Sequence, residues 1–487
     1  MMDVSRIQFG TDGWRALLGS EINADSIAVV AQAFMDALPE ITGRETGEIV
    51  IGYDGRESSA EFAAIFETCA AAHGWASYLS PEVVPTPVVS FNTLERGAQA
   101  GVMITASHNP TGYNGIKFKS ASGSPFSAEM TQVVEQHLGH HPFMATDGLV
   151  HTTDLWEPYG KHLERMIDFA AIREAGLKVA IDSMAGAGAR RLETILRDHG
   201  IEATTIDGEP RPDFNSRQAE PIEANLQPLR EFLASHPGYS IGLATDGDAD
   251  RLGVCLEDGS WQNAQETILL LSHYLLVKRG DPGALVKTAS VTKRLEAFAH
   301  KADRSVINVQ VGFKYVAEEM ERQMVAFGAE ESGGFGIGVH MPERDGIFSG
   351  LTMLELLAHS GHTRLSDLVH EIRLEVGDIH YRRIDIPTAV RDNGQWLNRL
   401  AEIAPGSIAG YSVTGTELFK SSRGWINGLK FHLEGEARWL LLRSSETEPL
   451  VRVYAEGDRT NEPVILLQAG RQLFKDAGVD FKDETGG

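Results

Sequence analysis

The stretch that begins at Glu48 reads EIVIGYD (residues 48–54), then SAEFAAIFETCAAAHG (59–74), then WASYLS (75–80). Its first and last parts are short apolar runs typical of strands, and its middle part carries apolar residues at helical spacing. A β-α-β unit of this kind implies parallel strands joined by a crossover helix. The pattern recurs twice, as KVAIDS (178–183), GARRLETILRDHG (188–200) and IEATTID (201–207), and as ALVKTAS (284–290), VTKRLEAFAHKA (291–302) and RSVINVQ (304–310). We therefore predict three α/β domains of similar architecture.

The chain after about Ile379 follows a different pattern. Short alternating or apolar strands precede a single helix-like segment, PVILLQAGRQLFKDAG (463–478). The strand-like segments are HYRRIDIP (380–387), GLKFHLEG (428–435), ARWLLLRSS (437–445) and LVRVYAEG (450–457). Several strands before one helix indicate an α+β domain with an antiparallel sheet.

Length and charge restrict the class of protein. At 487 residues the chain is too long for one hydrophobic core. Its 44 basic and 68 acidic residues give a net charge of −24, which argues against an electrostatic nucleic-acid binder. The N-terminus MMDVSRIQFGTDGW lacks the apolar core of a signal peptide, and no window approaches the run of about 18 apolar residues that a spanning helix needs. We expect a cytoplasmic protein that does not contact the membrane.

A serine followed by a histidine stands in TASHNP (105–110), after the apolar run AGVMI and before GYNGIKFK. A hydroxyl beside an imidazole at a strand-to-loop junction can form an activated nucleophile, which makes Ser107 and His108 candidate catalytic residues. A turn built from Ser, Asn and Pro explains the same residues equally well. Lys117, in the following strand-like segment, adds a cation that can offset the charge of a phosphate.

Three carboxylates at alternate positions follow the strand-like segment SIGLAT in DGDADR (246–251). They are Asp246, Asp248 and Asp250. Such side chains can converge on one hard cation, and Mg²⁺ prefers oxygen ligands of this kind. A solvated acidic turn is the alternative, although burying carboxylates between apolar strands without a cation is costly. A calcium-binding EF-hand loop with Glu257 as its last ligand fits poorly, because Arg251 occupies the place of the required glycine. Arg251 fits better as a hydrogen-bond donor to a phosphate that lies beside the metal.

Three further segments carry polar side chains in loops. EESGG (330–334) places carboxylates and a hydroxyl where they suit sugar hydroxyls, or it forms a tight surface turn. RSSETEP (443–449), with Arg452 just beyond it, has the hydroxyls, arginines and backbone N–H groups that can cradle a phosphate. FGTDGWR (9–15) is a glycine-punctuated turn with one arginine, and by itself it indicates no function.

Taken together and in this order, these segments closely resemble the α-D-phosphohexomutase family, that is, enzymes of the phosphoglucomutase/phosphomannomutase type. The resemblance covers essentially the whole chain. It implies three related α/β domains with mixed sheets and a smaller C-terminal α+β domain around a central cleft. The domains expected are domain I with the phosphoserine loop (1–150), domain II with the metal loop (151–262), domain III with the sugar loop (263–377) and domain IV with the phosphate loop (378–487).

The resemblance also implies a role for each matching residue. Ser107 resembles the residue that carries the transferred phosphate. The implied metal ligands are Ser107, Asp246, Asp248 and Asp250. The other implied catalytic residues, around the transferred phosphate, are Arg15, His108, Lys117 and Arg251. The implied substrate-binding residues are Lys287, Glu331, Ser332, Arg443, Ser445, Thr447 and Arg452.

The activity implied by the resemblance is the interconversion of hexose 1-phosphate and hexose 6-phosphate, for glucose and/or mannose. A phosphoserine would donate its phosphate to the sugar, with hexose 1,6-bisphosphate as intermediate and activator. Mg²⁺ is the implied cofactor. The implied partner is a small phosphosugar, with no nucleic acid and no membrane, and the implied assembly is a monomer or homodimer.

Two positions depart from the family pattern. The fourth-domain loop usually carries glycine or asparagine where this chain has Glu446, and Gly334 stands where many phosphomannomutase-type members have histidine. By analogy, the sugar loop favours glucose or mannose phosphates over glucosamine phosphate. The alternatives are a glucosamine-phosphate mutase, a phosphatase that uses Asp246 as phosphoryl acceptor, and a phosphosugar-binding protein without turnover.

Overall fold

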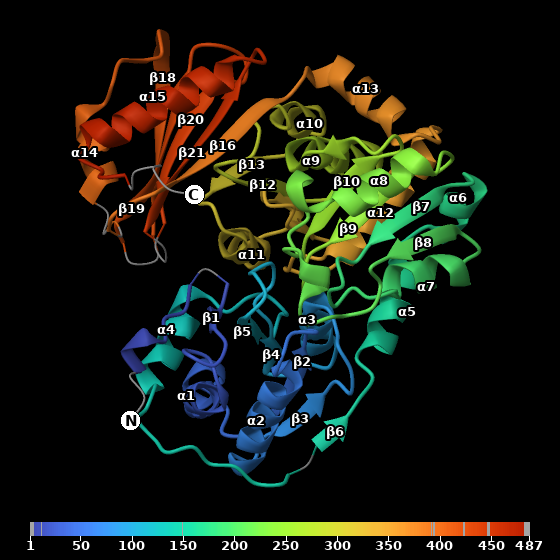
Figure 1. Cartoon of the computed structure of the whole chain (residues 1–487), viewed down its shortest axis with the longest axis vertical. Helices are drawn as coiled ribbons and strands as arrows, with labels where there is room; N and C mark the ends of the chain where they lie inside the picture. The colour runs from blue at the N-terminus through green and yellow to red at the C-terminus, as the bar shows by residue number, and fades with distance from the viewer. Residues whose placement is uncertain are drawn as a thin grey trace.

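Four sheets with their helices make up the part of the chain that the computed structural model describes (Figure 1). The described residues are 4–10, 12–148, 150–390, 392, 395–421, 424–445 and 449–481. The fold class is the predicted one, with three α/β domains followed by a domain built on an antiparallel sheet. The domain boundaries given above stay predictions.

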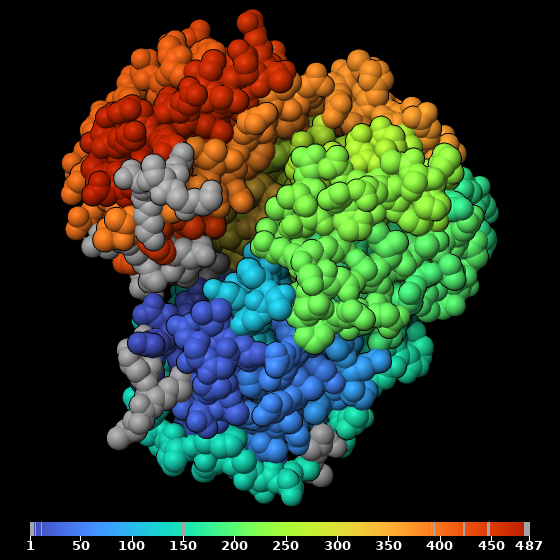
Figure 2. All heavy atoms as spheres, viewed as in Figure 1, coloured from blue at the N-terminus to red at the C-terminus, as the bar shows by residue number. Residues whose placement is uncertain are grey.

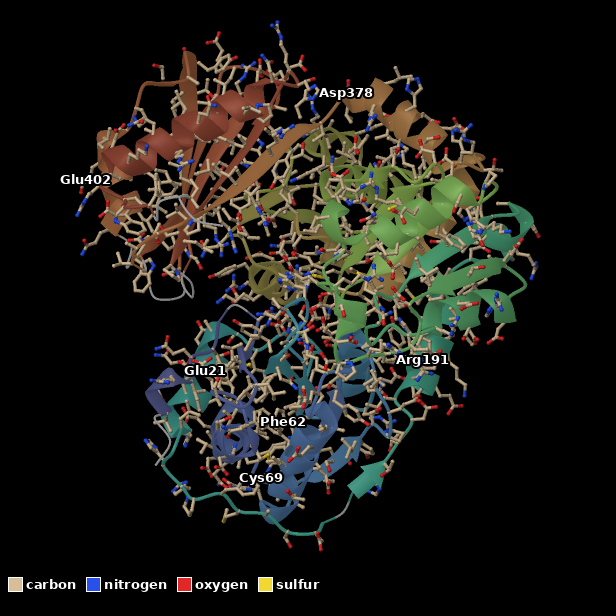
Figure 3. All side chains as sticks on the ribbon, in the orientation of Figure 1. Glu21, Phe62, Cys69, Arg191, Asp378 and Glu402 are labelled. Atoms are coloured by element: carbon tan, nitrogen blue, oxygen red, sulfur yellow. The ribbon has the colours of Figure 1, made fainter. Side chains whose placement is uncertain are left out.

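The first sheet is mixed and has the strand order β1-β5-β4-β2-β3-β6. Strand β2 runs parallel to β3 and β4, whereas β5 is antiparallel to β4 and β1. The elements are β1 (Trp14–Leu17), α1 (Ala24–Thr42), β2 (Glu48–Tyr53), α2 (Ser59–Ala72), β3 (Ala76–Leu79), α3 (Thr86–Glu95), β4 (Ala100–Ile104), β5 (Tyr113–Ser120), α4 (Ala128–His137) and β6 (Val150–Thr152). Phe62 and Cys69 of α2 are buried in the core of this domain (Figure 3).

The second sheet has the order β11-β10-β9-β7-β8. Strand β7 is parallel to both β8 and β9, and β10 returns antiparallel to β9. The elements are α5 (Trp156–Met166), α6 (Phe169–Glu174), β7 (Lys178–Asp182), α7 (Arg191–Asp198), β8 (Glu202–Ile206), α8 (Gln227–Ser235), β9 (Ile241–Thr245), β10 (Leu252–Leu256) and β11 (Trp261–Gln262).

The third sheet has the order β13-β12-β14-β15. Strand β12 is parallel to β13 and β14, and β15 is antiparallel to β14. The elements are α9 (Ala264–Ser272), β12 (Ala284–Thr288), α10 (Glu296–Lys301), β13 (Val306–Val309), α11 (Phe313–Arg322), β14 (Val325–Ala329), β15 (Phe335–Ile337), α12 (Gly346–Ser360) and α13 (Leu365–Val376). With these pairings, the predicted parallel β-α-β arrangement is confirmed in all three copies.

The helix of the third unit is shorter than the predicted segment 291–302, because α10 begins only at Glu296. The residues before it bond to other parts of the molecule instead of forming a helical turn. The backbone N–H of Thr292 donates to Gln265 Oε1 at 2.8 Å, and its hydroxyl donates to Glu456 Oε1 at 2.5 Å. Tertiary contacts therefore override helical periodicity at this end of the segment.

The fourth sheet is antiparallel and has the order β16-β21-β20-β19-β18-β17. The connection from α13 to its first strand passes through Asp378 (Figure 3). The elements are β16 (His380–Pro387), α14 (Gln395–Ile403), β17 (Ser407–Ile408), β18 (Tyr411–Lys420), β19 (Ile426–Leu433), β20 (Trp439–Ser444), β21 (Leu450–Gly457) and α15 (Glu462–Asp476).

In each of the first three sheets, one strand is buried along its whole length and leads directly into a polar motif. Strand β4 leads into Thr105–Pro110, β9 into Asp246–Arg251 and β14 into Glu330–Gly334. Loops at the carboxyl ends of such strands are the usual place for ligands in α/β sheets. In Figure 2 the olive part of the third domain lies recessed between the fourth and second domains. No described helix combines the length and apolar character needed to cross a membrane.

Candidate active site

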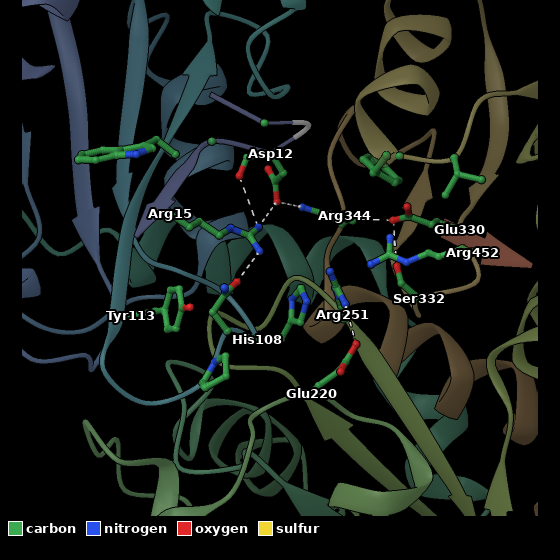
Figure 4. A pocket seen from close by; sticks show the side chains of 18 of the residues that line it. Asp12, Arg15, His108, Tyr113, Glu220, Arg251, Glu330, Ser332, Arg344 and Arg452 are labelled. Atoms are coloured by element: carbon green, nitrogen blue, oxygen red, sulfur yellow. Dashed lines mark hydrogen bonds and ion pairs between the residues drawn. The ribbon is translucent and has the colours of Figure 1, made fainter. Parts of the chain in front are cut away.

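A cleft of about 670 Å³ lies where the four domains meet (Figure 4). Every domain contributes side chains to its lining. They include Asp12, Arg15 and His108 from the first domain, Glu220 and Arg251 from the second, Glu331, Ser332 and Arg344 from the third, and Arg383, Arg443, Arg452 and Tyr454 from the fourth. The structure thus brings seven of the fifteen predicted site residues, from distant parts of the sequence, into the lining of one cleft.

Ser107 is buried directly beside the acidic loop. Its Oγ donates a hydrogen bond to Asp246 Oδ2 at 2.9 Å, and His108 Nδ1 lies 3.3 Å from the same Oγ. The backbone at Ser107 has φ 50°, the left-handed conformation that is uncommon outside glycine. Thr105 Oγ1 accepts from the Ser107 N–H at 2.8 Å, and Arg56 Nη2 donates to the Ser107 carbonyl at 2.7 Å. These bonds hold the hydroxyl toward the carboxylates.

The three aspartates of the acidic loop form the kind of cluster that binds a cation. One carboxylate oxygen from each of Asp246, Asp248 and Asp250 lies within 4.8 Å of the other two, and all three side chains are buried. Asp248 Oδ1 and Asp250 Oδ1 are buried without a hydrogen-bond partner. Burial, together with the charges of Asp250 and Asp248, raises the pKa of Asp246 well above its ordinary value. Buried, unpartnered carboxylate oxygens fit an oxygen-coordinated divalent cation such as Mg²⁺.

Lys117 and Arg344 add positive charge beside this cluster. Lys117 Nζ lies 2.7 Å from both Asp248 Oδ2 and Asp250 Oδ2, and 3.0 Å from Asp12 Oδ2. Burial alone would lower the pKa of Lys117, but the three carboxylates outweigh burial and raise it. Arg344 Nη2 donates to Asp12 Oδ2 at 2.6 Å and to Asp250 Oδ2 at 2.7 Å. Lys117 therefore places a positive charge beside the three aspartates.

His108, Arg15 and Arg251 line the cleft (Figure 4). Arg15 Nη1 donates to Asn109 Oδ1 at 3.0 Å, and Arg251 Nη1 lies 3.5 Å from Glu220 Oε1. Burial and the neighbouring arginines hold the pKa of His108 well below its ordinary value. Two guanidinium groups thus face the cleft beside an imidazole.

The sugar-loop candidates lie on the third-domain side of the cleft. Glu331 Oε2 accepts from the Ser290 hydroxyl and, at 3.4 Å, from Thr288 Oγ1. Ser332 Oγ donates to Glu330 Oε2 at 2.9 Å. A Cβ at position 334 would lie 2.4 Å from Arg344 Cδ, so the arginine occupies the space that a histidine side chain would need there.

The fourth-domain candidates are only partly described. Arg443 and Arg452 line the cleft, and Ser445 is buried, with its N–H donating to the Leu450 carbonyl at 3.1 Å. Thr447 and Glu446 lie outside the described residues.

Lys287 lies apart from the other predicted residues. Its side chain is buried, lies 2.8 Å from Glu296 Oε1, and is not among the described residues that line the cleft. Its positive charge acts on the buried Lys430 of the fourth domain. The structure therefore places Lys287 near the contact between the third and fourth domains, and its binding role stays a prediction.

Sequence reasoning missed several residues of the site. Thr86 Oγ1 donates to Asp248 Oδ2 at 2.6 Å, and Arg56 holds the serine loop through its carbonyls. Asp12, Arg344 and Arg383 were also missed. Asp12 stands inside the glycine-punctuated turn, where its position beside Arg15 was the only available signal. The others lie outside every motif and had no signal.

The chain matches four family models that follow one another along its length. They are described as Phosphoglucomutase/phosphomannomutase, alpha/beta/alpha domain I (residues 6–143), domain II (157–259), domain III (263–374) and C-terminal domain (392–467).

Individual relatives agree with these matches over almost their whole lengths. A phosphoglucomutase/phosphomannomutase of Thermococcus kodakarensis is 28% identical over 473 residues, which are 96% of this chain and 98% of the relative. A phosphoglucosamine mutase of Thermobifida fusca is 29% identical over 92% of this chain and 93% of the relative. The solved structure of a Thermus thermophilus protein, provisionally named a phosphomannomutase, has a TM-score of 0.82 at 32% identity and covers 96% and 99% of the two chains.

Proposed function

This chain belongs to the phosphoglucomutase/phosphomannomutase family and is a phosphohexomutase, and on this basis we propose that it interconverts the 1- and 6-phosphates of glucose or mannose. The phosphate passes through Ser107, and a hexose 1,6-bisphosphate is the intermediate. The observation that carries the proposal is the contact of Ser107 Oγ with Asp246 Oδ2 at 2.9 Å, inside a cluster of three buried carboxylates.

The first half-reaction starts from phosphorylated Ser107 and a hexose monophosphate. The bond from a free sugar hydroxyl to phosphorus forms while the bond from phosphorus to Ser107 Oγ breaks. The sugar hydroxyl loses a proton and Ser107 Oγ gains one. His108 Nδ1, at 3.3 Å from Oγ, is our candidate for handling the proton at the serine.

Charge stabilisation supplies most of the expected catalysis, because phosphoryl transfer depends on positioning and on neutralising the transferring oxygens. Mg²⁺ held by the three aspartates and the phosphate on Ser107 would supply positive charge to the phosphoryl oxygens. Lys117 holds Asp248 and Asp250 in place and adds charge of its own. Arg251 and Arg15 line the cleft at the position where a transferred phosphate would pass.

The intermediate must turn around so that its second phosphate can return to Ser107. A separate site must hold whichever phosphate is not reacting. Arg443 and Arg452 of the fourth domain line the cleft, and in Figure 4 Arg452 lies across it from Arg15 and His108. Glu331 and Ser332 also line the cleft, and in the proposed function they accept and donate hydrogen bonds to sugar hydroxyls.

A glucosamine phosphate is the second candidate substrate. Relatives at similar identity are named phosphoglucosamine mutases. Glu330 and Glu331 also lie at the proposed sugar position, where a carboxylate can pair with the ammonium group of glucosamine.

The test is a turnover comparison of glucose 1-phosphate, mannose 1-phosphate and glucosamine 1-phosphate, each with Mg²⁺ and its own bisphosphate. We expect glucose or mannose phosphate to give the highest kcat/KM. Faster turnover of glucosamine 1-phosphate would transfer the assignment to the second candidate, and no turnover of any of the three would contradict the proposed function.

A further inference from the structure

The fourth sheet has two chemically different faces. On one face, Leu440, Leu442, Val451 and Val453 pack with helices α14 and α15 into the core of the domain. Because successive side chains of a strand point to opposite faces, the residues between them form the other face. Where this second face meets the cleft it carries arginines instead of apolar side chains.

Three arginines of this face come from three neighbouring strands. Arg383 lies on β16, Arg452 on β21 and Arg443 on β20, and all three line the cleft. Arg452 pairs directly with Arg443 across the sheet, and Tyr454, two residues beyond Arg452, pairs with Arg383. The three arginines therefore occupy neighbouring positions on one face of the sheet.

This arrangement is unfavourable without an anion. Like charges directly opposite each other in a sheet repel, and Arg443 and Arg452 are such a pair. Asp385 is an acidic residue of the same strand as Arg383, and the charge of Glu331 also raises the pKa of Arg383. Asp385 Oδ1 lies 3.1 Å from Arg383 Nε, and Asp385 Oδ2 lies 3.1 Å from Arg452 Nε. Three guanidinium groups that line one cleft provide the positive charge and the N–H donors that a phosphate monoester dianion needs.

We propose that Arg383 is a third arginine of the site that holds the non-transferred phosphate. The inference rests on the proposed function and extends it, because the phosphate loop around Arg443 and Arg452 does not include β16. Asp385 fixes Arg383 and Arg452 relative to each other through their Nε atoms. Arginine is suited to this role because its planar fork binds phosphate oxygens in pairs.

The chain supplies a matched control in Arg382. It is the same residue type on the same strand, one position earlier, and therefore starts from the opposite face of the sheet. Arg382 is exposed and is not among the described residues lining the cleft. Arg383 is itself 41% exposed on its side chain, so its replacement should not disturb the core.

The experiment compares R383A, R383K and R382A with the unmodified full-length protein. Calorimetry measures binding of inorganic phosphate and of glucose 6-phosphate, and a coupled assay measures KM and kcat. Loss of a charge-assisted contact should weaken binding of both ligands and raise KM about ten- to a hundredfold in R383A. R383K should recover part of the affinity because it keeps the charge but not the fork, and R382A should bind as the unmodified protein does. Because Arg383 binds the phosphate that does not react, kcat at saturation should change only a few-fold.

Two results separate the inference from the function. If the unmodified protein binds and turns over hexose phosphates and R383A does so with unchanged KM, the inference is wrong while the function stands. If the unmodified protein neither binds nor turns over hexose phosphates but binds inorganic phosphate through Arg383, the proposed function fails and the anion site stands. Equal weakening by R382A and R383A would also overturn the inference, because it would reflect general surface charge.

Discussion

At the scale of single residues, carboxylates and cations alternate in a buried network at the edge of the cleft. Asp250 Oδ2 accepts from Lys117 Nζ and from Arg344 Nη2, each at 2.7 Å, and the same two cations also reach Asp12. Buried charges are tolerated when they are paired, and removal of one partner leaves the other uncompensated. Substitutions in this network should therefore have effects far larger than those of surface ion pairs.

Ser107 should carry a phosphate in part of the purified protein. Its hydroxyl, the proposed nucleophile, lies 2.9 Å from Asp246 Oδ2 of the carboxylate cluster. Intact-mass and peptide mass spectrometry should find one added phosphate at this residue, and incubation with glucose 1,6-bisphosphate should increase it. Unmodified Ser107 after that incubation would rule out the covalent route.

Asp248→Asn should lower kcat by about a hundredfold or more and change KM much less, because its charge acts mainly on the transition state. Asp248 Oδ2 accepts from Thr86 and Lys117, so the amide keeps the shape of the site while the charge is lost. Steady-state kinetics at saturating Mg²⁺ measures the effect. Asp378→Asn, an exposed carboxylate between the third and fourth domains, is the control and should leave kcat unchanged. A near-normal kcat for Asp248→Asn would exclude this carboxylate as a metal ligand.

At the scale of elements, the loops after β4 and β9 touch through their backbones. A Cβ on Gly247 would lie 2.4 Å from the carbonyl oxygen of Ser107, closer than any side chain allows. The glycine therefore sets how near the serine loop and the acidic loop can approach. The proposed site depends on this approach because one loop carries the proposed nucleophile and the other carries the proposed metal ligands.

Gly247→Ala should lower kcat by about tenfold or more, since a shift of the serine loop by even about 1 Å misplaces the reacting group. The thermal unfolding temperature should fall by only a few degrees. Gly406→Ala has no atom within 4 Å of its added methyl group and serves as the control. Unchanged kcat in Gly247→Ala would show that the two loops do not need their close approach.

The polar face of the fourth sheet also buries an amine where it meets the third domain. Lys430 Nζ donates to the carbonyl of Ala289 at 2.6 Å and is almost fully buried. Burial, followed by repulsion from Lys287, lowers the pKa of Lys430 from its ordinary 10.5 to about 7, although Glu417, Glu456 and Glu296 oppose this shift. The folded protein therefore binds this proton more weakly than the unfolded chain does.

This depressed pKa predicts a specific pH dependence. Between about pH 7 and pH 10 the unfolded chain binds more protons at Lys430 than the folded chain, so the free energy of unfolding gains a contribution that rises with pH. Lys430→Met removes that contribution. The Tm of the variant relative to the unmodified protein should be highest near pH 6.5 and decrease toward pH 9. Exposed Lys420→Met should show no such trend, and a pH-independent difference for Lys430→Met would contradict the assignment.

At the scale of the whole molecule, the four domains do not have four separate cores. One continuous cluster of buried side chains joins the second and third domains and includes residues of α3 in the first domain, with α12 packed against β9 and β10. The first and fourth domains have clusters of their own. The fourth domain contacts the third through a small cluster that contains Ala289, Val311, Trp439, Leu441 and Tyr454. The position of the fourth-domain arginines that line the cleft (Arg383, Arg443 and Arg452) therefore depends on this smaller contact.

Glu456→Ala should weaken that contact. The carboxylate accepts from the Thr292 hydroxyl at 2.5 Å, from the Lys293 N–H at 3.1 Å and from Trp439 Nε1 at 2.6 Å. Leaving a buried donor unsatisfied costs about 1–3 kcal/mol. KM should rise several-fold while phosphorylation of Ser107 by the bisphosphate persists, as kinetics and mass spectrometry can measure. Exposed Glu434→Ala is the control. An unchanged KM in Glu456→Ala would show that the contact does not position the arginines of the fourth domain in the cleft.

Local patterns in the sequence were enough to predict the fold class, and they marked Ser107 and the aspartate triad as candidates for the site. Strand and helix periodicity depend on near neighbours, and the three parallel β-α-β units appear as predicted. Ser107 and the aspartate triad stand in short motifs directly after buried strands, and the structure brings them together. The shortened α10 shows the limit of this reasoning, because contacts of Thr292 with distant residues decide where that helix begins.

The architecture, the nucleophile candidate and the acidic loop could thus be predicted without coordinates, because all of them depend on residues close together in the chain. The tertiary structure decides which isolated charged residues lie beside the nucleophile candidate and the acidic loop. Arg344 reaches Asp12 and Asp250, and Arg383 stands beside Arg452, whereas Lys287 turns to Glu296 near a domain contact. The sequence around an isolated arginine or lysine does not indicate where its side chain lies in the folded protein. Its partners depend on strand register and domain packing, which bring together residues far apart in the sequence.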